Sequence, residues 1–93
     1  MSDKPDSNSQ QAALERAQTA KRTYEEALLA RANVVGVGVG LIRRRGVLTG
    51  EIGIIVMVSR KVRRSELAPS DVVPTELEGV PVDVQEVGEI RAE

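Results

Sequence analysis

The sequence predicts a small α+β domain, in which an N-terminal amphipathic helix packs on a mainly antiparallel sheet of three strands. Three observations lead to this prediction. Residues 9–32 are rich in alanine, leucine, glutamate, lysine, arginine and glutamine, which favour helix. Two runs dense in valine and isoleucine then flank a short glycine-bearing segment, a pattern typical of a β-hairpin. After an irregular crossover, valine alternates with other residues over 80–87, which indicates a third strand.

The helix is expected at residues 9–32, after a disordered polar segment at 1–8. Its three-four spacing produces an amphipathic stripe that includes small side chains, formed by Leu14, Ala17, Lys21, Tyr24, Leu28 and Arg31. Asn33 is placed to end the helix in a left-handed conformation. We expect this stripe to pack within the domain, with pairing to a second copy as the alternative.

The hairpin is expected from strands at about 34–45 and 51–61. Valine and glycine alternate over residues 35–40, so one strand face is valine and the other is nearly bare. With the turn centred on Leu48, Gly40 lies opposite Val56 and Gly38 lies opposite Val58. Three alternate glycines weaken a strand unless another element approaches closely. We therefore expect the helix, with its alanines, to cover the glycine face.

The crossover contains Pro69 and Pro74, each of which disfavours helix at the preceding residue. We expect short helical turns here, including one over 75–78. The expected anchors to the core are Leu67, Val72, Val73 and Leu77. The third strand, at 80–87, contains Pro81, which lacks an N–H donor and suits a strand start or an edge. Residues 9–88 are expected to form a single domain, followed by a tail at 89–93.

The composition argues against several functional classes. The 93 residues include no cysteine and no histidine, which removes thiolate nucleophiles and conventional catalytic triads. Glu76, Glu78, Asp83 and Glu86 show no metal-ligand spacing and are expected to be solvated. The glycines of 36–40 do not fit the G-x-G-x-x-G phosphate fingerprint. We therefore expect no enzyme activity, no metal and no cofactor.

Charge and hydropathy also restrict the partners. The net charge of −1 provides no strong field toward nucleic acid or membranes. The longest apolar stretch is too short to span a bilayer, and no secretion signal is visible, so a cytoplasmic location is expected. The sequence has one tyrosine and no phenylalanine or tryptophan. A core of aliphatic side chains alone is thin for a small domain, so we expect stabilisation by a partner or a second copy.

Two basic clusters lie at opposite ends of the expected hairpin. The first consists of Arg43, Arg44 and Arg45, and the second consists of Arg60, Lys61, Arg63 and Arg64. No aromatic residue on the expected strands is available to stack on bases. Charges that prevent sheet-to-sheet association are therefore a better interpretation than nucleic-acid binding, which stays as a minor alternative.

Three stretches carry a resemblance to a known family. They read NVVGVGVG at 33–40, EIGIIVMVSRKVRRSEL at 51–67 and VPTELEGVPVDVQEVGEIRA at 73–92. Together they resemble the module N-terminal to the peptidase domain in bacterial trypsin-like serine proteases akin to the plant narrow-leaf protein. The matching positions are 33–38, 65–67, 73–74, 79–81 and 83–84.

The resemblance implies association with a protease. In that family a domain with catalytic histidine, aspartate and serine follows the module, and none of those residues has a counterpart here. The chain is therefore expected to be a prodomain-like segment or a stand-alone relative.

We therefore expect a non-catalytic accessory module that docks on a trypsin-like protease domain or another protein. The alternative is a self-associating structural module. The candidate interaction surface consists of Gly36, Gly38, Gly40, Tyr24, Leu28, Arg43, Arg44, Arg45, Arg60, Arg63 and Arg64.

Overall fold

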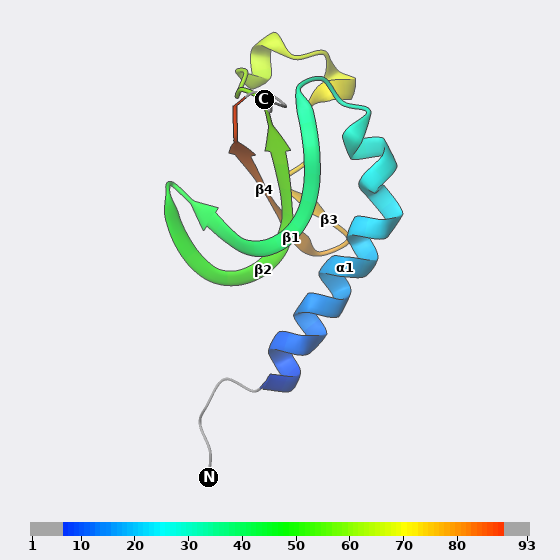
Figure 1. Ribbon diagram of the computed structural model, residues 1–93, viewed down its shortest axis with the longest axis vertical. Coiled ribbons are helices and arrows are strands. Elements are labelled where there is room, and N and C mark those ends of the chain that lie inside the picture. Colours follow the sequence, from blue (N-terminus) through cyan, green and yellow to red (C-terminus); the bar gives the residue numbers. More distant parts are fainter. Residues whose placement is uncertain (1–6, 89–93) are drawn as a thin grey trace, which may run out of the picture.

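The computed structural model describes residues 7–88, without the side chains of Ser7, Asn8 and Arg64. Residues 1–6 of the segment expected to be disordered and all of the expected tail (89–93) lie outside the described residues. Residues 7 and 8 of that segment begin the helix instead. One helix is followed by four strands and two short 3₁₀ turns (Figure 1). In chain order these are α1 (Ser7–Leu29), β1 (Val34–Arg44), β2 (Val47–Val58), η1 (Arg64–Glu66), η2 (Pro69–Asp71), β3 (Glu76–Leu77) and β4 (Val80–Glu86).

The α+β class is confirmed, but the expected mainly antiparallel sheet of three strands is a mixed sheet of four. The sheet has four strands in the order β1-β2-β4-β3, and β2 pairs with β4 in parallel. The parallel pair arises because residues 59–79 carry the chain back along the sheet before β4 begins. β3 forms where a helical turn was expected. The next two residues, Glu78 and Gly79, have positive φ angles of 52° and 81° and turn the chain back into β4. Positive φ at both central residues makes a type I′ turn, which joins antiparallel strands.

The hairpin register also differs from the expected one. The turn is formed by Arg45 and Gly46, with φ of 55° and 79°, so β2 begins at Val47 and not near residue 51. Gly38 consequently pairs with Ile55, not with Val58. This is a shift of three residues, and an odd shift exchanges the two faces of β2 relative to β1.

The exchanged faces decide where the helix packs. Val37 and Val39, not the glycines, share a face with the buried residues Ile54 and Val56. α1 packs on this valine face, so the expectation that it covers the glycine face is wrong. The buried core cluster consists of Ala17, Ala20, Leu28, Ile54, Val56, Val58, Val80 and Val82. The small alanines let α1 approach the valine side chains closely.

The crossover is tied to the end of α1. The helix ends at Leu29, three residues earlier than expected, and Asn33 has the left-handed φ of 71° that was expected of it. Arg31 Nη1 donates to the carbonyl oxygens of Ser70 and Val72, the latter at 3.0 Å. All four expected crossover anchors are half-buried, and Val73 and Leu77 contact the core cluster.

Candidate docking surface at the hairpin tip

The hairpin curls, so that the end of β1 reaches across β2 to β4 (Figure 1). The backbone N–H of Arg43 donates to Asp83 Oδ2 at 2.9 Å, and Arg44 Nη1 donates to the carbonyl oxygen of Val82 at 3.2 Å. Gln85 Nε2 donates to the same Asp83 oxygen at 3.1 Å. Asp83 is only 8% exposed, so the expectation that it is solvated is wrong. A buried carboxylate requires hydrogen bonds, and those to Asp83 hold the curl in place.

Packing beneath the curl depends on one glycine. Ile42 is fully buried, although it lies outside the main core cluster. A Cβ atom at Gly53 would collide with the carbonyl oxygen of Pro81 and would lie 2.8 Å from Ile42 Cδ1. Gly53 therefore provides the space that Ile42 fills, and this small second core stabilises the curl.

A bulge in β2 lies next to this second core. Leu41 pairs with Ile52 and Arg43 pairs with Leu48, so residues 49–51 lie opposite a single residue of β1. Thr49 Oγ1 donates to the carbonyl oxygen of Ile42 at 3.0 Å and accepts from the N–H of Glu51 at 3.2 Å. A bulge of this kind bends a hairpin and increases its local twist.

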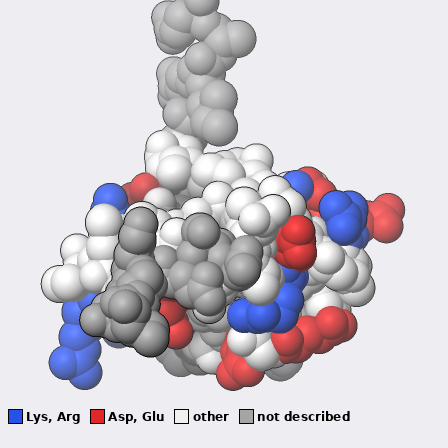
Figure 2. All heavy atoms as spheres, turned by 90° about the horizontal axis from the view of Figure 1, so that it is seen from below, with Lys and Arg blue, Asp and Glu red and all other residues white. Residues whose placement is uncertain are grey.

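The curl presents an exposed group of apolar and basic side chains. Leu41, Val47 and Leu48 are 48%, 66% and 53% exposed. Arg43, Arg44 and Arg45, the tip arginines, are all exposed. Figure 2 shows basic side chains beside uncharged surface on the left, the side on which the hairpin tip lies in both views. We call these six residues the tip surface.

Arg45 has a left-handed backbone conformation, which is unfavourable for a residue that carries a side chain. Its φ of 55° places it at the first central position of the type I′ turn, where asparagine, aspartate and glycine are preferred. A residue other than glycine in this region costs about 1–2 kcal/mol. A strained residue on an exposed turn is a reason to look for a functional role, and here the strain coincides with the tip surface.

Comparison with known proteins defines the family. Residues 10–87 match the model of the NARROW LEAF 1 N-terminal domain. The chain belongs to the NARROW LEAF 1 N-terminal domain family. No curated protein matches the chain. The match runs from α1 to the residue after β4, and so includes the whole sheet and the hairpin tip.

No metal centre is visible in the part of the chain that the structure describes. Within 7–88, no group of three or more acidic side chains is placed to hold a metal ion. Nor is any helix there long and apolar enough to cross a bilayer. Among the described residues, the tip surface places exposed apolar and basic side chains together.

The candidate glycines lie on the face opposite the helix. Gly36, Gly38 and Gly40 are half-buried and lie beside the side chains of Met57 and Ile55 on the neighbouring strand. A Cβ atom at Gly38 would lie 3.8 Å from Met57 Cε, which is an ordinary contact distance. The glycine face is thus covered partly by β2 itself, and it is not closed.

The two candidate residues on α1 have different environments. Leu28 is 1% exposed and belongs to the core, so its side chain is not at the surface. Tyr24 is half-buried, and its hydroxyl donates to Glu78 Oε2 at 2.8 Å. This hydrogen bond is the main cause that raises the pKa of Tyr24 above its usual 10.0, with smaller contributions from burial and from the negative charge of Glu78. The pair connects α1 to the β3–β4 turn.

The second basic cluster lies at the other end of β2 from the tip surface. Arg60 and Arg63 are exposed, and the side chain of Arg64 is not described. Arg60 and Lys61 line a cavity of about 230 Å³ together with Asn33. The two basic clusters therefore do not meet, as the sequence predicted.

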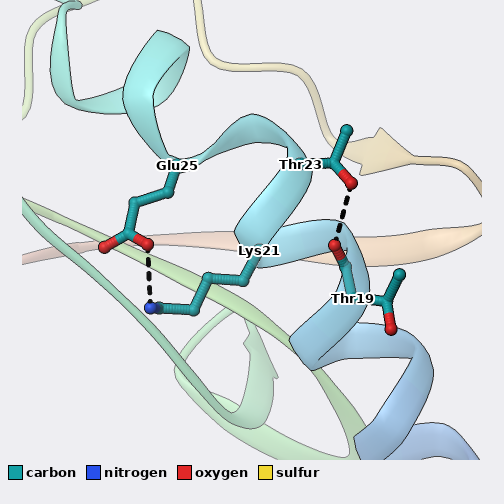
Figure 3. Close-up of polar contacts among 4 residues, drawn as sticks. All are labelled: Thr19, Lys21, Thr23 and Glu25. Atoms are coloured by element: carbon teal, nitrogen blue, oxygen red, sulfur yellow. Dashed lines mark hydrogen bonds and ion pairs between the residues drawn. The ribbon is translucent and has the colours of Figure 1, made fainter.

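The polar contacts of α1 are mostly within the helix itself. Lys21 Nζ pairs with Glu25 Oε1 at 3.1 Å, and Thr23 Oγ1 donates to the carbonyl oxygen of Thr19 at 3.0 Å (Figure 3). An i,i+4 pair with lysine before glutamate contributes only a few tenths of a kcal/mol. These contacts are those of a solvated helix face and point to no ligand.

Sequence reasoning missed several residues of this site. It passed over Gly53, Leu41 and Val47, and placed Leu48 at the centre of the turn. An Arg-Gly pair is a weak turn signal compared with Asn-Gly, so the true turn was not recognised. No sequence pattern indicated that Asp83 is buried. Its burial depends on the curl of the hairpin, which brings Arg43 next to Asp83 although they are 40 residues apart in the chain.

Proposed function

We propose that this chain is a non-catalytic docking module that binds a partner protein through the tip surface. One observation supports this most strongly. Three exposed aliphatic side chains and three exposed arginines lie together on a hairpin whose tip is hydrogen-bonded to β4. Arginine is enriched at protein interfaces, and the buried centre of an interface is more apolar than its rim. The hydrogen bonds to β4 restrict the hairpin tip before binding, which lowers the ordering cost of binding.

A trypsin-like protease domain is the partner that we propose first. Membership of the NARROW LEAF 1 N-terminal domain family supports this, together with the resemblance to the module that precedes bacterial trypsin-like peptidase domains. In this role the module assists the folding, inhibition or positioning of the protease domain and contributes no catalytic residue.

The test is binding to a separately expressed protease domain from a bacterial protease of this kind. We expect co-purification, and we expect the Val47→Ser, Leu48→Ser double variant to weaken binding by about tenfold or more, as removal of central apolar contacts does. Leu14→Ser is the matched control, since Leu14 is 38% exposed on α1, away from the tip surface. Absence of binding, together with no effect on protease folding or activity, contradicts the protease proposal.

Self-association is the second proposed function, and it is supported by the outer edge of β1, which pairs with no further strand among residues 7–88. β1 is the outermost strand of the sheet and is 11 residues long. Residues 34–42 of this strand carry no charge, and an uncharged stretch of edge strand can pair between copies. Light scattering over a micromolar range tests this proposal. A cooperatively folded monomer at every concentration counts against it.

A further inference from the structure

Along residues 34–41 the outer edge of β1 pairs with no other described strand, whereas at Arg43 the backbone is bound by Asp83 of β4. β1 lies at one end of the strand order, and no described strand pairs with its outer side. Val35 and Leu41 are 42% and 48% exposed, whereas Ile54 and Val56 on the neighbouring β2 are fully buried. The other edge of the sheet is β3, which has only two residues. β1 is therefore the one long edge of this sheet among residues 7–88.

This edge lacks the features that normally prevent strand addition. Residues 34–42 contain no charge and no proline. The register irregularities occur at the two ends, between 34 and 36 and between 41 and 43, so 36–41 form a regular strand. Natural edges are usually protected by lysine, proline, a central bulge or a short length. Their absence here marks the edge as a place for a further strand.

The glycine face leaves room for the side chains of an added strand. Ile55 and Met57 are only half-buried where they lie across from Gly38 and Gly36. Alternate side chains of an added strand would lie over the bare glycines and contact these two residues. Main-chain hydrogen bonds would supply affinity and these contacts would supply selectivity, as in other cases of strand addition.

We infer that the β1 edge binds an extended segment of a partner protein with an uncharged centre and acidic ends. Basic side chains near both ends of the β1 edge are the reason for proposing acidic residues at the ends of the bound segment. The tip arginines follow one end of the edge, and Arg60 and Lys61 lie beside Asn33 at the other. The carboxylates of the nearby Asp71 and Glu86 each already accept a backbone N–H, from Ala32 at 2.9 Å and from Lys61 at 3.0 Å. Opposite charges across an interface fix the orientation of the bound partner and disfavour the binding of other proteins.

A second copy of β1 fits this edge less well. Antiparallel pairing of two β1 strands would bring the tip arginines of one copy to the end where the other copy carries Arg60 and Lys61. Like charges placed together in this way oppose pairing. An acidic segment has no such conflict.

The probe is a blocked synthetic peptide with five alternating threonine and valine residues between two aspartates at each end. We expect it to bind with measurable affinity by calorimetry and to slow amide hydrogen exchange at residues 35–41 by about tenfold. One control peptide has lysine for aspartate, and a second has proline for the central valines. Both control peptides are expected to bind at least about tenfold more weakly. The lysine peptide places like charges next to the basic residues of the protein, and the proline peptide cannot form a hydrogen-bonded strand.

Protein variants make the test specific to this edge. Arg43→Glu with Arg45→Glu removes the complementary charge at one end of the edge and should weaken binding of the aspartate peptide by about tenfold, while Arg16→Glu on α1 should change nothing. Equal binding of the proline and valine peptides, or no added protection at 35–41, overturns the inference. Failure of the aspartate peptide to bind overturns it as well.

The inference rests on the proposed docking role but fails separately from it. The Val47→Ser, Leu48→Ser variant removes apolar contacts of the tip surface and leaves β1 intact. Loss of protease-domain binding by this variant, with peptide binding retained, supports two distinct contacts. Protease-domain binding without any peptide binding supports the docking proposal and overturns the edge site.

Discussion

At the scale of single residues, the glycines of this chain have different roles. Gly53 faces the backbone oxygen of Pro81 and the side chain of Ile42, whereas Gly38 faces only the flexible end of Met57. The two positions lie on the same face of the same hairpin, so they form a matched pair. A methyl group added at each measures how closely the curl is packed.

We expect Gly53→Ala to destabilise the domain by about 1–3 kcal/mol, because the new methyl group meets backbone that cannot move aside. Gly38→Ala should be neutral or stabilise by about 0.4–1 kcal/mol, since it reduces the freedom of the unfolded chain without a clash. Thermal melts of the two variants provide the comparison. Equal melting temperatures for both variants would contradict the packing described for Gly53.

Arg45 provides a second prediction at this scale. Arg45→Asn should stabilise the isolated domain by about 0.5–1 kcal/mol, because asparagine tolerates the left-handed conformation of the turn better. The same change should weaken binding to a protease domain if Arg45 serves the tip surface. Urea denaturation and calorimetry measure the two effects. A variant that is more stable and binds as well as the wild type would show that Arg45 has no role in docking.

At the scale of elements, the curl of the hairpin depends on the contact between β1 and β4. Asp83→Ala removes the acceptor for the N–H of Arg43 and leaves that donor without its partner. We expect a loss of about 1–3 kcal/mol, as for other buried donors deprived of an acceptor. Asp83→Asn is the control, because it keeps an acceptor oxygen and should lose less.

Hydrogen exchange at the amide of Arg43 reports directly on this contact. We expect faster exchange in Asp83→Ala than in Asp83→Asn, with the amides of the β2–β4 ladder less affected. Unchanged exchange at Arg43 in the alanine variant would show that the hairpin tip is held by something other than Asp83.

At the scale of the whole molecule, α1 and the sheet share one small aliphatic core. Leu28 is its largest contribution from the helix and is 1% exposed, whereas the adjacent Leu29 is 44% exposed. We expect Leu28→Ala to cost about 2–5 kcal/mol, because it leaves a cavity. Leu29→Ala should change stability by less than about 0.5 kcal/mol.

Calorimetry and circular dichroism should show one cooperative transition for the wild type, as for most single domains of this size. The Leu28→Ala variant should melt well below the wild type or fail to fold, since small domains have little stability to lose. A helix that melts separately from the sheet would contradict the shared core. Leu29→Ala, measured in the same way, is the control for replacing a helical leucine that is not in the core.

The sequence by itself determined the α+β class, the extent of the helix to within three residues, the presence of the hairpin and the strand near residue 80. These follow from local causes, namely helix propensity, the density of β-branched residues and the alternation of valine. The left-handed conformation of Asn33 also followed from its position after the helix. The separation of the two basic clusters followed from the antiparallel hairpin.

Only the tertiary structure decided the register, the strand order, the face that the helix covers and the burial of Asp83. The register depended on whether the turn formed at Arg45 and Gly46 or around Leu48, and a shift of three residues exchanged the faces. The parallel pairing of β2 with β4 depended on the path of the crossover, which has no regular pattern in the sequence. The tip surface exists because Ile42 fits over Gly53 and Asp83 binds the backbone of Arg43. Such contacts join residues far apart in the chain, and local propensity carries no information about them.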